Sequence, residues 1–485
     1  MRQWLAEGIL LAACGGAAGV VLAMWGVPLL LSLSPAELPR AREVHIDALA
    51  LAVALGLAVL CGLVLGGLPA LASSPGGLSE RGVAGGRSRA RAVLVVAEVG
   101  LALVLLTGAG AAARSFQRVA LRNPGFRAED VLTFRLSLPA ARYRTPQDLA
   151  RFRDRLYERL AAIPGVTAAG AVSILPLSGP LGAADFTIEG YPPSKASEKP
   201  TADYRIIDPT YLAAMRIPIL QGRGFTERDN EGNGAVAIVS EQAVKLFWKG
   251  RDPIGSRILL EDNSGTARTV QVVGVAGNVH EAGLDKAVSV CVFVPIPQIP
   301  RPLARFLTNN FFWAIRAQPG VNIARQSREA IQGVDSDVAA AESPMTRYVD
   351  TSMAARRFSL RILAAFALAA VLLAGAGLYA LVSYTMAART REIGIRVAMG
   401  AHPRQIAAMA VREGATLAGL GAIIGTACAW GLARYAQALL FEVGPHDPAA
   451  ICGAGGVMIA VAAMASWIPA RRAARVDPVQ ALRGD

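Results

Sequence analysis

Apolar residues gather into long runs in the first and last quarters of the chain, whereas the middle alternates between apolar and polar positions. A helix that crosses a bilayer needs about 20 predominantly apolar residues. The pattern predicts six membrane-spanning helices, at residues 7–31, 48–68, 92–113, 362–382, 415–433 and 449–468. The first run is longer than the ~7–15 apolar residues of a signal peptide, and only Arg2 precedes it as a basic residue. We therefore expect a span there.

The segment between the third and fourth predicted spans carries the signals of a folded domain. In Val131–Leu138 alternate positions are apolar, which is typical of a strand with one buried face. Thr145 and Pro146 then begin a predicted helix, which Pro164 and Gly165 end. The segment therefore predicts an α+β domain, with further strands at residues 168–175, 235–239 and 269–275.

Composition supports a membrane protein, because 53% of the residues are hydrophobic and only 18% are charged. The net charge is +13, and such a basic excess can indicate nucleic acid or the inner side of a membrane. The basic residues beside the apolar runs are all arginines, which argues against a basic nucleic-acid-binding arm. The five lysines all lie in the polar middle of the chain: Lys195, Lys199, Lys245, Lys249 and Lys286.

Arginines in the short loops predict the orientation of the chain, because cytoplasmic loops carry an excess of basic residues. If the spans alternate, fourteen arginines fall on one side and three on the other. Both termini are therefore predicted to be cytoplasmic, and residues 114–361 to be periplasmic in a bacterial cell. The fourteen are Arg2, Arg81, Arg87, Arg89, Arg91, Arg389, Arg391, Arg396, Arg404, Arg412, Arg471, Arg472, Arg475 and Arg483; the three are Arg40, Arg42 and Arg434.

The sequence contains no pattern that predicts a catalytic or metal site. Asp229–Gly234, DNEGNG, spaces its oxygen ligands like a calcium loop, but Ser240 stands where the loop needs a glutamate, so we expect an ordinary polar turn. None of the five lysines follows a glycine, which excludes a P-loop within this sequence. The four histidines are scattered. We expect no metal, no cofactor and no enzymatic activity on this chain.

The first two predicted spans repeat the last two. LPA at 68–70 corresponds to IPA at 468–470. Only the second copy is preceded by a span, a large external segment and a further span. The sequence therefore predicts either that the chain is a shortened form of a duplicated architecture, or that a second polypeptide supplies the elements that the first copy lacks. Five residues of the leading helix recur at a constant offset: Glu7, Gly8, Leu11, Gly15 and Gly19 match Glu413, Gly414, Leu417, Gly421 and Gly425.

A charged stretch, Arg389–Ile406, separates the fourth and fifth predicted spans and is expected to contain a short cytoplasmic helix, which Gly400 and Pro403 end. Such a rod, fixed to two spans, suits the transfer of movement from a partner into the membrane. The alternative is an interfacial helix that binds only lipid headgroups. Residues four apart pair along the helix: Glu392 with Arg396 as an ion pair, and Ile393 with Val397 and Ile395 with Met399 as apolar ridges.

Five stretches resemble a known family, the permease subunits of the MacB/FtsX type, which work with a separate ABC ATPase. The likeness covers the whole chain and is closest to the duplicated, two-unit permeases of that group, without their first span and first periplasmic domain. The stretches are RTREIGIRVAMGA (389–401), IPARRAARVDPVQALRGD (468–485), QGRGF (221–225), DPIGSRI (252–258) and VQVVGVAGNV (270–279).

The resemblance implies an α-helical integral membrane protein with an inserted α+β extracytoplasmic domain. Residues 1–91 are implied to form two transmembrane helices, which close a first FtsX-like unit, and a cytoplasmic linker. Residues 92–113 are implied to form one transmembrane helix, and residues 114–361 a MacB-like periplasmic domain. Residues 362–485 are implied to form an FtsX-like domain with three transmembrane helices and a coupling helix at 389–401.

The same resemblance implies a permease subunit of the bacterial inner membrane that couples ATP hydrolysis on a separate ATPase to movement of the periplasmic domain, for export or mechanotransmission. The implied partners are the cytoplasmic ATPase, the lipid bilayer, a second copy or a second permease, and periplasmic or outer-membrane proteins, but no nucleic acid. The residues implied to couple to the ATPase are Arg391, Glu392, Ile395, Arg396, Ala398 and Met399.

The sequence is also compatible with two other hypotheses. In the first, the chain is a membrane-anchored sensor or scaffold whose periplasmic domain binds a ligand without transport. In the second, the absent first unit leaves an inactive remnant. An ABC ATPase reading frame next to the one for this chain would favour the transport hypothesis over the sensor. Membrane expression and oligomer size would test the remnant hypothesis, since a non-functional fragment should be poorly assembled.

Overall fold

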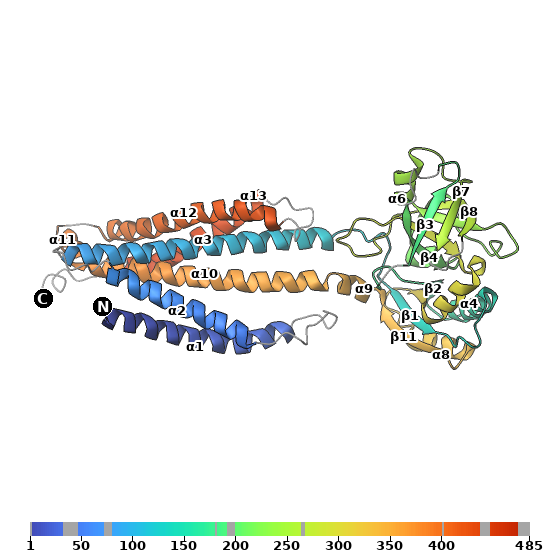
Figure 1. Ribbon diagram of the computed structural model, residues 1–485, viewed down its shortest axis with the longest axis horizontal. Helices are drawn as coiled ribbons and strands as arrows, with labels where there is room; N and C mark the ends of the chain where they lie inside the picture. The colour runs from blue at the N-terminus through green and yellow to red at the C-terminus, as the bar shows by residue number, and fades with distance from the viewer. Residues whose placement is uncertain are drawn as a thin grey trace. The chain divides into compact units, whose positions relative to one another are not determined.

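The computed structural model describes residues 2–32, 47–71, 80–179, 182–191, 199–262, 267–399, 402–436 and 447–473. The chain divides into two units, each formed largely by its own contacts. Unit 1 comprises Met1–Arg118 and Ala355–Asp485, and unit 2 comprises Val119–Ala354. Long helices make up unit 1, and a large sheet with short helices makes up unit 2 (Figure 1).

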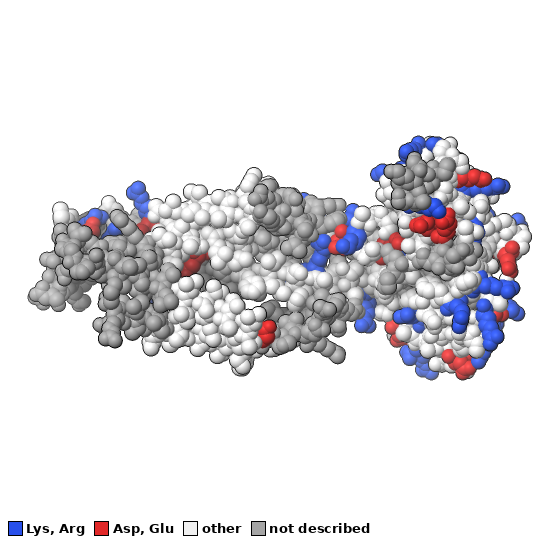
Figure 2. All heavy atoms as spheres, viewed as in Figure 1, with Lys and Arg blue, Asp and Glu red and all other residues white. Residues whose placement is uncertain are grey.

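Unit 1 is built from helices that expose apolar side chains. Leu22, Phe366 and Ile423 are each more than half exposed, as expected where lipid is the solvent. Figure 2 shows few charged side chains along the middle of these helices, whereas charged side chains are scattered over unit 2. The helices are α1 (Arg2–Ser32), α2 (Ala48–Leu71), α3 (Glu80–Ala120), α10 (Ala354–Ala388), α11 (Thr390–Ala398), α12 (Pro403–Ala436) and α13 (Pro448–Ala473).

Five helices of the described chain are long and apolar enough to cross a membrane. Their apolar stretches, which lie in α1, α3, α10, α12 and α13, coincide with five of the six predicted spans. The remaining predicted span, residues 48–68, falls on α2. Within α2 only Ala48–Leu60 has side chains that the structure describes, and this part is a shorter apolar helix.

Close approach of α12 to α3 depends on glycine. A Cβ built on Gly425 would lie 2.6 Å from the carbonyl oxygen of Gly100, and one built on Gly421 would lie 2.6 Å from the Val99 side chain. A larger residue at either position would therefore push the two helices apart. The surrounding core includes Leu103 of α3 and Leu378 of α10.

Unit 2 is organised around an 11-stranded sheet in the order β11-β1-β10-β2-β4-β3-β7-β8-β6-β9, with β5 beside β8. Because β9 also pairs with β4, the strands β4, β3, β7, β8, β6 and β9 form a closed ring. The strands are β1 (Val131–Ser137), β2 (Val166–Val172), β3 (Ala183–Ile188), β4 (Thr201–Ile207), β5 (Ile219–Gly222), β6 (Val236–Ser240), β7 (Arg257–Asp262), β8 (Ala267–Ala276), β9 (Cys291–Pro295), β10 (Phe311–Ala317) and β11 (Ala339–Pro344).

Short helices connect these strands. In α4, the Thr145 side chain accepts a hydrogen bond from the Asp148 N–H, and the Asp148 carboxylate accepts one from the Thr145 N–H, which makes a capping box. The connecting helices are α4 (Pro146–Ala161), α5 (Tyr211–Met215), α6 (Glu241–Ala243), η3 (Val244–Trp248), η4 (Ile296–Gln298), α7 (Arg301–Asn309), α8 (Ala324–Val334) and α9 (Met345–Ser352).

The elements predicted in this segment from the sequence are confirmed. The alternating stretch forms β1, with Phe134 and Leu136 fully buried, and the predicted helix begins after Thr145 as α4. The three further strands appear as β2, β6 and β8. In the segment that resembled a calcium loop, the buried Asp229 carboxylate pairs with Arg223 at 2.7 Å and accepts the Thr226 N–H at 2.8 Å.

An ion pair lies inside unit 2. Arg205 of β4 donates from Nη2 to Glu281 Oε2 at 2.8 Å and from Nε at 3.2 Å, and only 1% and 2% of the two side chains are exposed. Burial raises the pKa of the Glu281 carboxyl, and the positive charge of Arg205 opposes that rise. Each charged group is therefore stabilised by its partner in place of water, because neither side chain can reach the solvent.

Asp208, which follows β4, is a second carboxylate without access to water. It accepts hydrogen bonds from the N–H and the hydroxyl of Thr210, both at 3.1 Å. Burial raises the pKa of Asp208 to about 7, although Arg153 and these hydrogen bonds oppose the rise. An aspartate in an unfolded chain has a pKa of about 3.9, so the folded state holds the proton more tightly.

We therefore expect the free energy of unfolding of unit 2 to depend on pH through Asp208. The stabilising contribution is complete below about pH 4 and is lost as the pH rises to about 7, for a total of up to about 4 kcal/mol. The Asp208→Asn variant should lose most of this dependence. Hydrogen exchange of the β2 and β4 amides in the full chain at several pH values, corrected for intrinsic exchange, measures it. An equal pH dependence in the variant and the parent would contradict the assignment.

Candidate coupling surface

α11 is joined to α10 by a single break in the helix. The N–H of Arg389 still donates to the carbonyl oxygens of Thr385 and Met386 at 3.2 Å, and the Thr390 hydroxyl donates to the Ala387 carbonyl at 2.7 Å. The Ile393 N–H then donates to the Arg389 carbonyl at 2.9 Å and begins the new helix. α11 is therefore held at its start by backbone contacts with α10.

Ile393 fixes one face of α11 to the neighbouring helices. It is 1% exposed and packs in an apolar cluster that draws residues from α10, α12 and α13. Gly394 beside it is also buried. The other buried members of the cluster are Val382, Met386, Ile406, Ala410 and Ala470.

The opposite face of α11 is exposed. Glu392, Ile395, Arg396 and Met399 follow the i, i+3, i+4, i+7 spacing that places residues on one side of a helix, and we call these four the α11 outer face. Ile395 is 46% exposed and Met399 84%. Arg396 Nη2 donates to Glu392 Oε1 at 2.5 Å. The predicted ion pair is thus formed, and it lies beside two exposed apolar side chains.

The structure brings together four of the six residues implied to couple. For the other two, Arg391 and Ala398, only the helical backbone is described, and their side chains lie outside the described residues. The expected helix, residues 389–401, is shorter in the structure, since α11 ends at Ala398; Gly400 and Ala401 lie outside the described residues.

The two predicted apolar ridges differ in exposure. Ile393 lies in the apolar cluster, whereas Ile395 and Met399 are exposed, and the side chain of Val397 lies outside the described residues. The two isoleucines are two positions apart, which places them about 200° apart on a helix. Their spacing could have shown from the sequence that one of them faces the membrane helices, but not which one.

A hollow of about 280 Å³ lies beside α11 within unit 1. Arg472 of α13 donates to the Tyr379 hydroxyl of α10 at 3.1 Å at its margin. Nearby, the Arg91 guanidinium lies 4.4 Å from the centre of the Tyr384 ring, a cation–π contact between α3 and α10. Arginines therefore mark this end of the helices, as expected for an end at a charged membrane surface.

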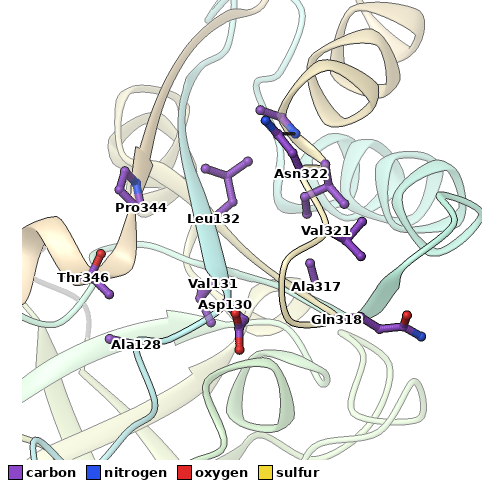
Figure 3. Close-up of a pocket in the computed structure, with 12 residues that line it drawn as sticks. Ala128, Asp130, Val131, Leu132, Ala317, Gln318, Val321, Asn322, Pro344 and Thr346 are labelled. Atoms are coloured by element: carbon purple, nitrogen blue, oxygen red, sulfur yellow. Dashed lines mark hydrogen bonds between the residues drawn. The ribbon is translucent and has the colours of Figure 1, made fainter.

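Unit 2 has a hollow of its own, of about 270 Å³, which Figure 3 shows in close-up. Leu132 of β1 and Val321 of the segment before α8 lie on either side of it, with Asp130 and Thr346 as polar lining. Ligand pockets usually measure about 300–1,000 Å³. Among the described residues, no group of three or more His, Cys, Asp and Glu side chains could hold a metal. The α11 outer face is thus the better candidate site.

Two family models match the chain. The MacB-like periplasmic core domain matches residues 93–332, and the FtsX-like permease C-terminal domain matches residues 364–478, which include α11. The chain is of the MacB/FtsX type. This MacB/FtsX-type chain has the fold class that its sequence predicts, several apolar helices with an inserted α+β domain of the periplasmic kind.

Curated relatives of this MacB/FtsX-type chain combine a permease with an ATP-binding part. The macrolide export ATP-binding/permease protein MacB 2 of Aeromonas hydrophila is 27% identical over 282 residues, 56% of this chain and 42% of the relative. The pyoverdine export ATP-binding/permease protein PvdT of Pseudomonas aeruginosa is 30% identical over 278 residues, 55% of this chain and 40% of the relative. The chain thus matches less than half the length of these relatives.

Solved structures similar to the MacB/FtsX-type chain include the periplasmic region of MacB from Actinobacillus actinomycetemcomitans. It covers 48% of this chain and 97% of its own, with 13% identity and a TM-score of 0.32. The extracellular domain of the ABC-type transporter YknZ from Gram-positive bacteria covers 44% of this chain and 99% of its own, with 15% identity and a TM-score of 0.28.

Proposed function

We propose that the chain is the membrane-spanning permease subunit of an ABC exporter and that its α11 outer face docks on a separate ATPase. The observation that carries the proposal is the division of α11 into two faces. Ile393 ties the helix to α10, α12 and α13, while Ile395 and Met399 remain exposed beside the Glu392–Arg396 pair. A helix held in this way can receive a push on one face and pass it to the spans on the other.

ATP hydrolysis is assigned to the partner. None of the five lysines follows a glycine, so this sequence offers no P-loop for nucleotide phosphates. The curated relatives are named as ATP-binding/permease proteins, and the part of them that matches this chain leaves more than half of their length unmatched. In the proposed complex, the chain supplies the permease and a second polypeptide supplies the ATPase.

The proposed orientation places α11 and both termini in the cytoplasm and unit 2 in the periplasm, with the chain in the inner membrane. The arginine asymmetry of the short loops supports it, fourteen residues against three. In the chain, α3 leads directly into unit 2 and α10 leads directly out of it. Movement of α11 would therefore reach unit 2 through α10, and the class of work is export or mechanotransmission.

The docking role predicts that Met399→Glu weakens binding of the ATPase. A carboxylate at the most exposed apolar position of the α11 outer face would have to lose its water on docking, and the apolar contact would be lost. We expect about 10–100-fold weaker binding and a matching loss of ATPase stimulation in vesicles that contain the full chain. The measurement is the rate of ATP hydrolysis as a function of the concentration of the ATPase. The ATPase used is the one that is encoded beside this chain or that copurifies with it.

Ala408→Glu is the matched control, because Ala408 is exposed on α12 and the change adds the same charge outside α11. It should leave stimulation within about twofold of the parent. Full stimulation by Met399→Glu, or an equal loss in both variants, would overturn the assignment of the α11 outer face. A parent chain that neither binds nor stimulates an ABC ATPase would overturn the proposed function as a whole.

A further inference from the structure

Corresponding positions lie between the two helices in the pair α1–α2 and in the pair α12–α13. A Cβ built on Gly16 would meet the Ala58 Cβ at 3.5 Å and a Leu55 methyl at 3.7 Å. In the second pair the corresponding residues, Ala422, Met458 and Gly455, line one common hollow between α12 and α13. The repeat seen in the sequence is therefore also a repeat of helix packing.

In the second pair, α3 covers the glycines of α12. Gly421 lies against Val99, and Gly425 lies against Gly100 and Leu103, at distances that leave no room for a Cβ. The matching glycines of α1 are Gly15 and Gly19, and a Cβ built on either meets no described atom within 4 Å. The apolar stretch Ala12–Leu29 that contains them has no buried residue. The surface that α3 covers in one copy is open in the other.

A carboxylate at the start of the second helix repeats as well. Asp47 caps α2 by accepting the Ala50 N–H at 2.6 Å, and Asp447 caps α13 by accepting the Ala449 N–H at 3.0 Å. The Asp447 side chain is only 8% exposed, because it also pairs with Arg114 of α3. Asp47 is exposed, and no arginine among the described residues pairs with it.

We propose that Gly15, Gly19 and Asp47 form a docking surface for a transmembrane helix of the α3 kind. Such a helix carries β-branched or small residues opposite the glycines and an arginine that reaches Asp47. The helix comes from outside residues 1–485, because α3 already occupies the face of α12. The longest segment that the structure leaves undescribed, residues 33–46, is also shorter than the about 20 residues of a span. This surface concerns assembly, and it stands whether or not α11 couples to an ATPase.

The probe is a synthetic helix with the sequence of residues 92–118, which contains the covering face of α3 and Arg114. It is added to vesicles that hold the full chain, with the five native cysteines replaced by alanine. The chain carries Ala50→Cys and the probe carries Gly110→Cys, so the glycines of the proposed surface stay intact. A Cβ built on Gly110 would lie 3.5 Å from the Cβ of Ala450, the residue of α13 that corresponds to Ala50 of α2, so this pair is close enough for a disulfide.

We expect a disulfide between Ala50→Cys and the probe. Ala52→Cys is the matched control, because Ala52 is also exposed but lies about 200° further around α2. It should not react. A probe with Arg114→Glu should react about tenfold less, and Asp47→Arg in the chain should restore the reaction of that altered probe.

Three results would overturn the proposal. The first is no disulfide with the probe while the within-chain pair Ala450→Cys and Gly110→Cys forms one. The second is equal reaction at Ala50→Cys and Ala52→Cys. The third is a disulfide between two copies of the Ala50→Cys chain that the probe does not compete away, since that would assign the surface to self-association.

Discussion

Ile393→Ala should leave the ATPase bound but remove its stimulation. The side chain is 1% exposed in the cluster that joins α11 to α10, α12 and α13, and truncation of such a buried residue costs about 2–5 kcal/mol. α11 has only nine residues, which is too few for a stable helix without tertiary contacts. The α11 outer face would keep its side chains, so docking survives, but the helix would move without moving the spans.

Two readouts separate this outcome from a simple loss of binding. Hydrogen exchange of the α11 amides in the full chain should rise, whereas copurification of the ATPase should persist. Ile395→Ala is the matched control, because it removes the same atoms from an isoleucine that is 46% exposed. It should weaken docking slightly without faster exchange in α11. Full stimulation by Ile393→Ala would show that the buried face of α11 transmits nothing.

The sequence predicts the spans and the local elements well because their signals are local. A run of apolar residues is sufficient evidence for a span. Thr145, Pro146 and Asp148 together specify where α4 begins. The alternation in β1 likewise shows which of its side chains are buried. Each of these elements is specified within about 20 consecutive residues.

Non-local features could not be predicted in the same way. β4 pairs with β9 in parallel, with Asp203 opposite Cys291, and this pairing closes the ring. The sequence of neither strand indicates that the other is its partner. Arg205 and Glu281 are 76 residues apart, and polar residues in a β segment and a loop normally face water. Glu281 lies between β8 and β9 in the chain, so only the tertiary fold brings it to Arg205 of β4.

The candidate site was predictable in its local features and unpredictable in its contacts with other helices. The i,i+4 spacing of Glu392 and Arg396 predicts their ion pair from the sequence alone, and the structure contains it. The covering of one face of α11 depends on Met386, Ile406 and Ala470, which belong to three other helices. A sequence can thus show that a helix has two apolar sides without showing which side remains free.

Removal of one charge from the buried ion pair should give the largest loss of stability in unit 2. In Glu281→Ala, the Arg205 guanidinium stays 1% exposed without its partner, and breaking a buried pair in this way costs about 3–5 kcal/mol. We expect the amides of β4 and β9 to exchange about two to four orders of magnitude faster in the full chain, because opening of these strands becomes that much less costly. Hydrogen exchange resolved to single peptides measures it.

Two further variants separate loss of charge pairing from loss of packing. The double variant Arg205→Met and Glu281→Leu replaces both charges with apolar groups of similar size, and exchange should return close to that of the parent. Arg325→Ala breaks the exposed Arg325–Glu329 pair of α8 and should change nothing measurable, since water screens that pair. The double variant could instead exchange as fast as Glu281→Ala. In that case the hydrogen bonds of the ion pair would be what stabilises the closed ring, and the unpaired charge of Arg205 would not explain the loss.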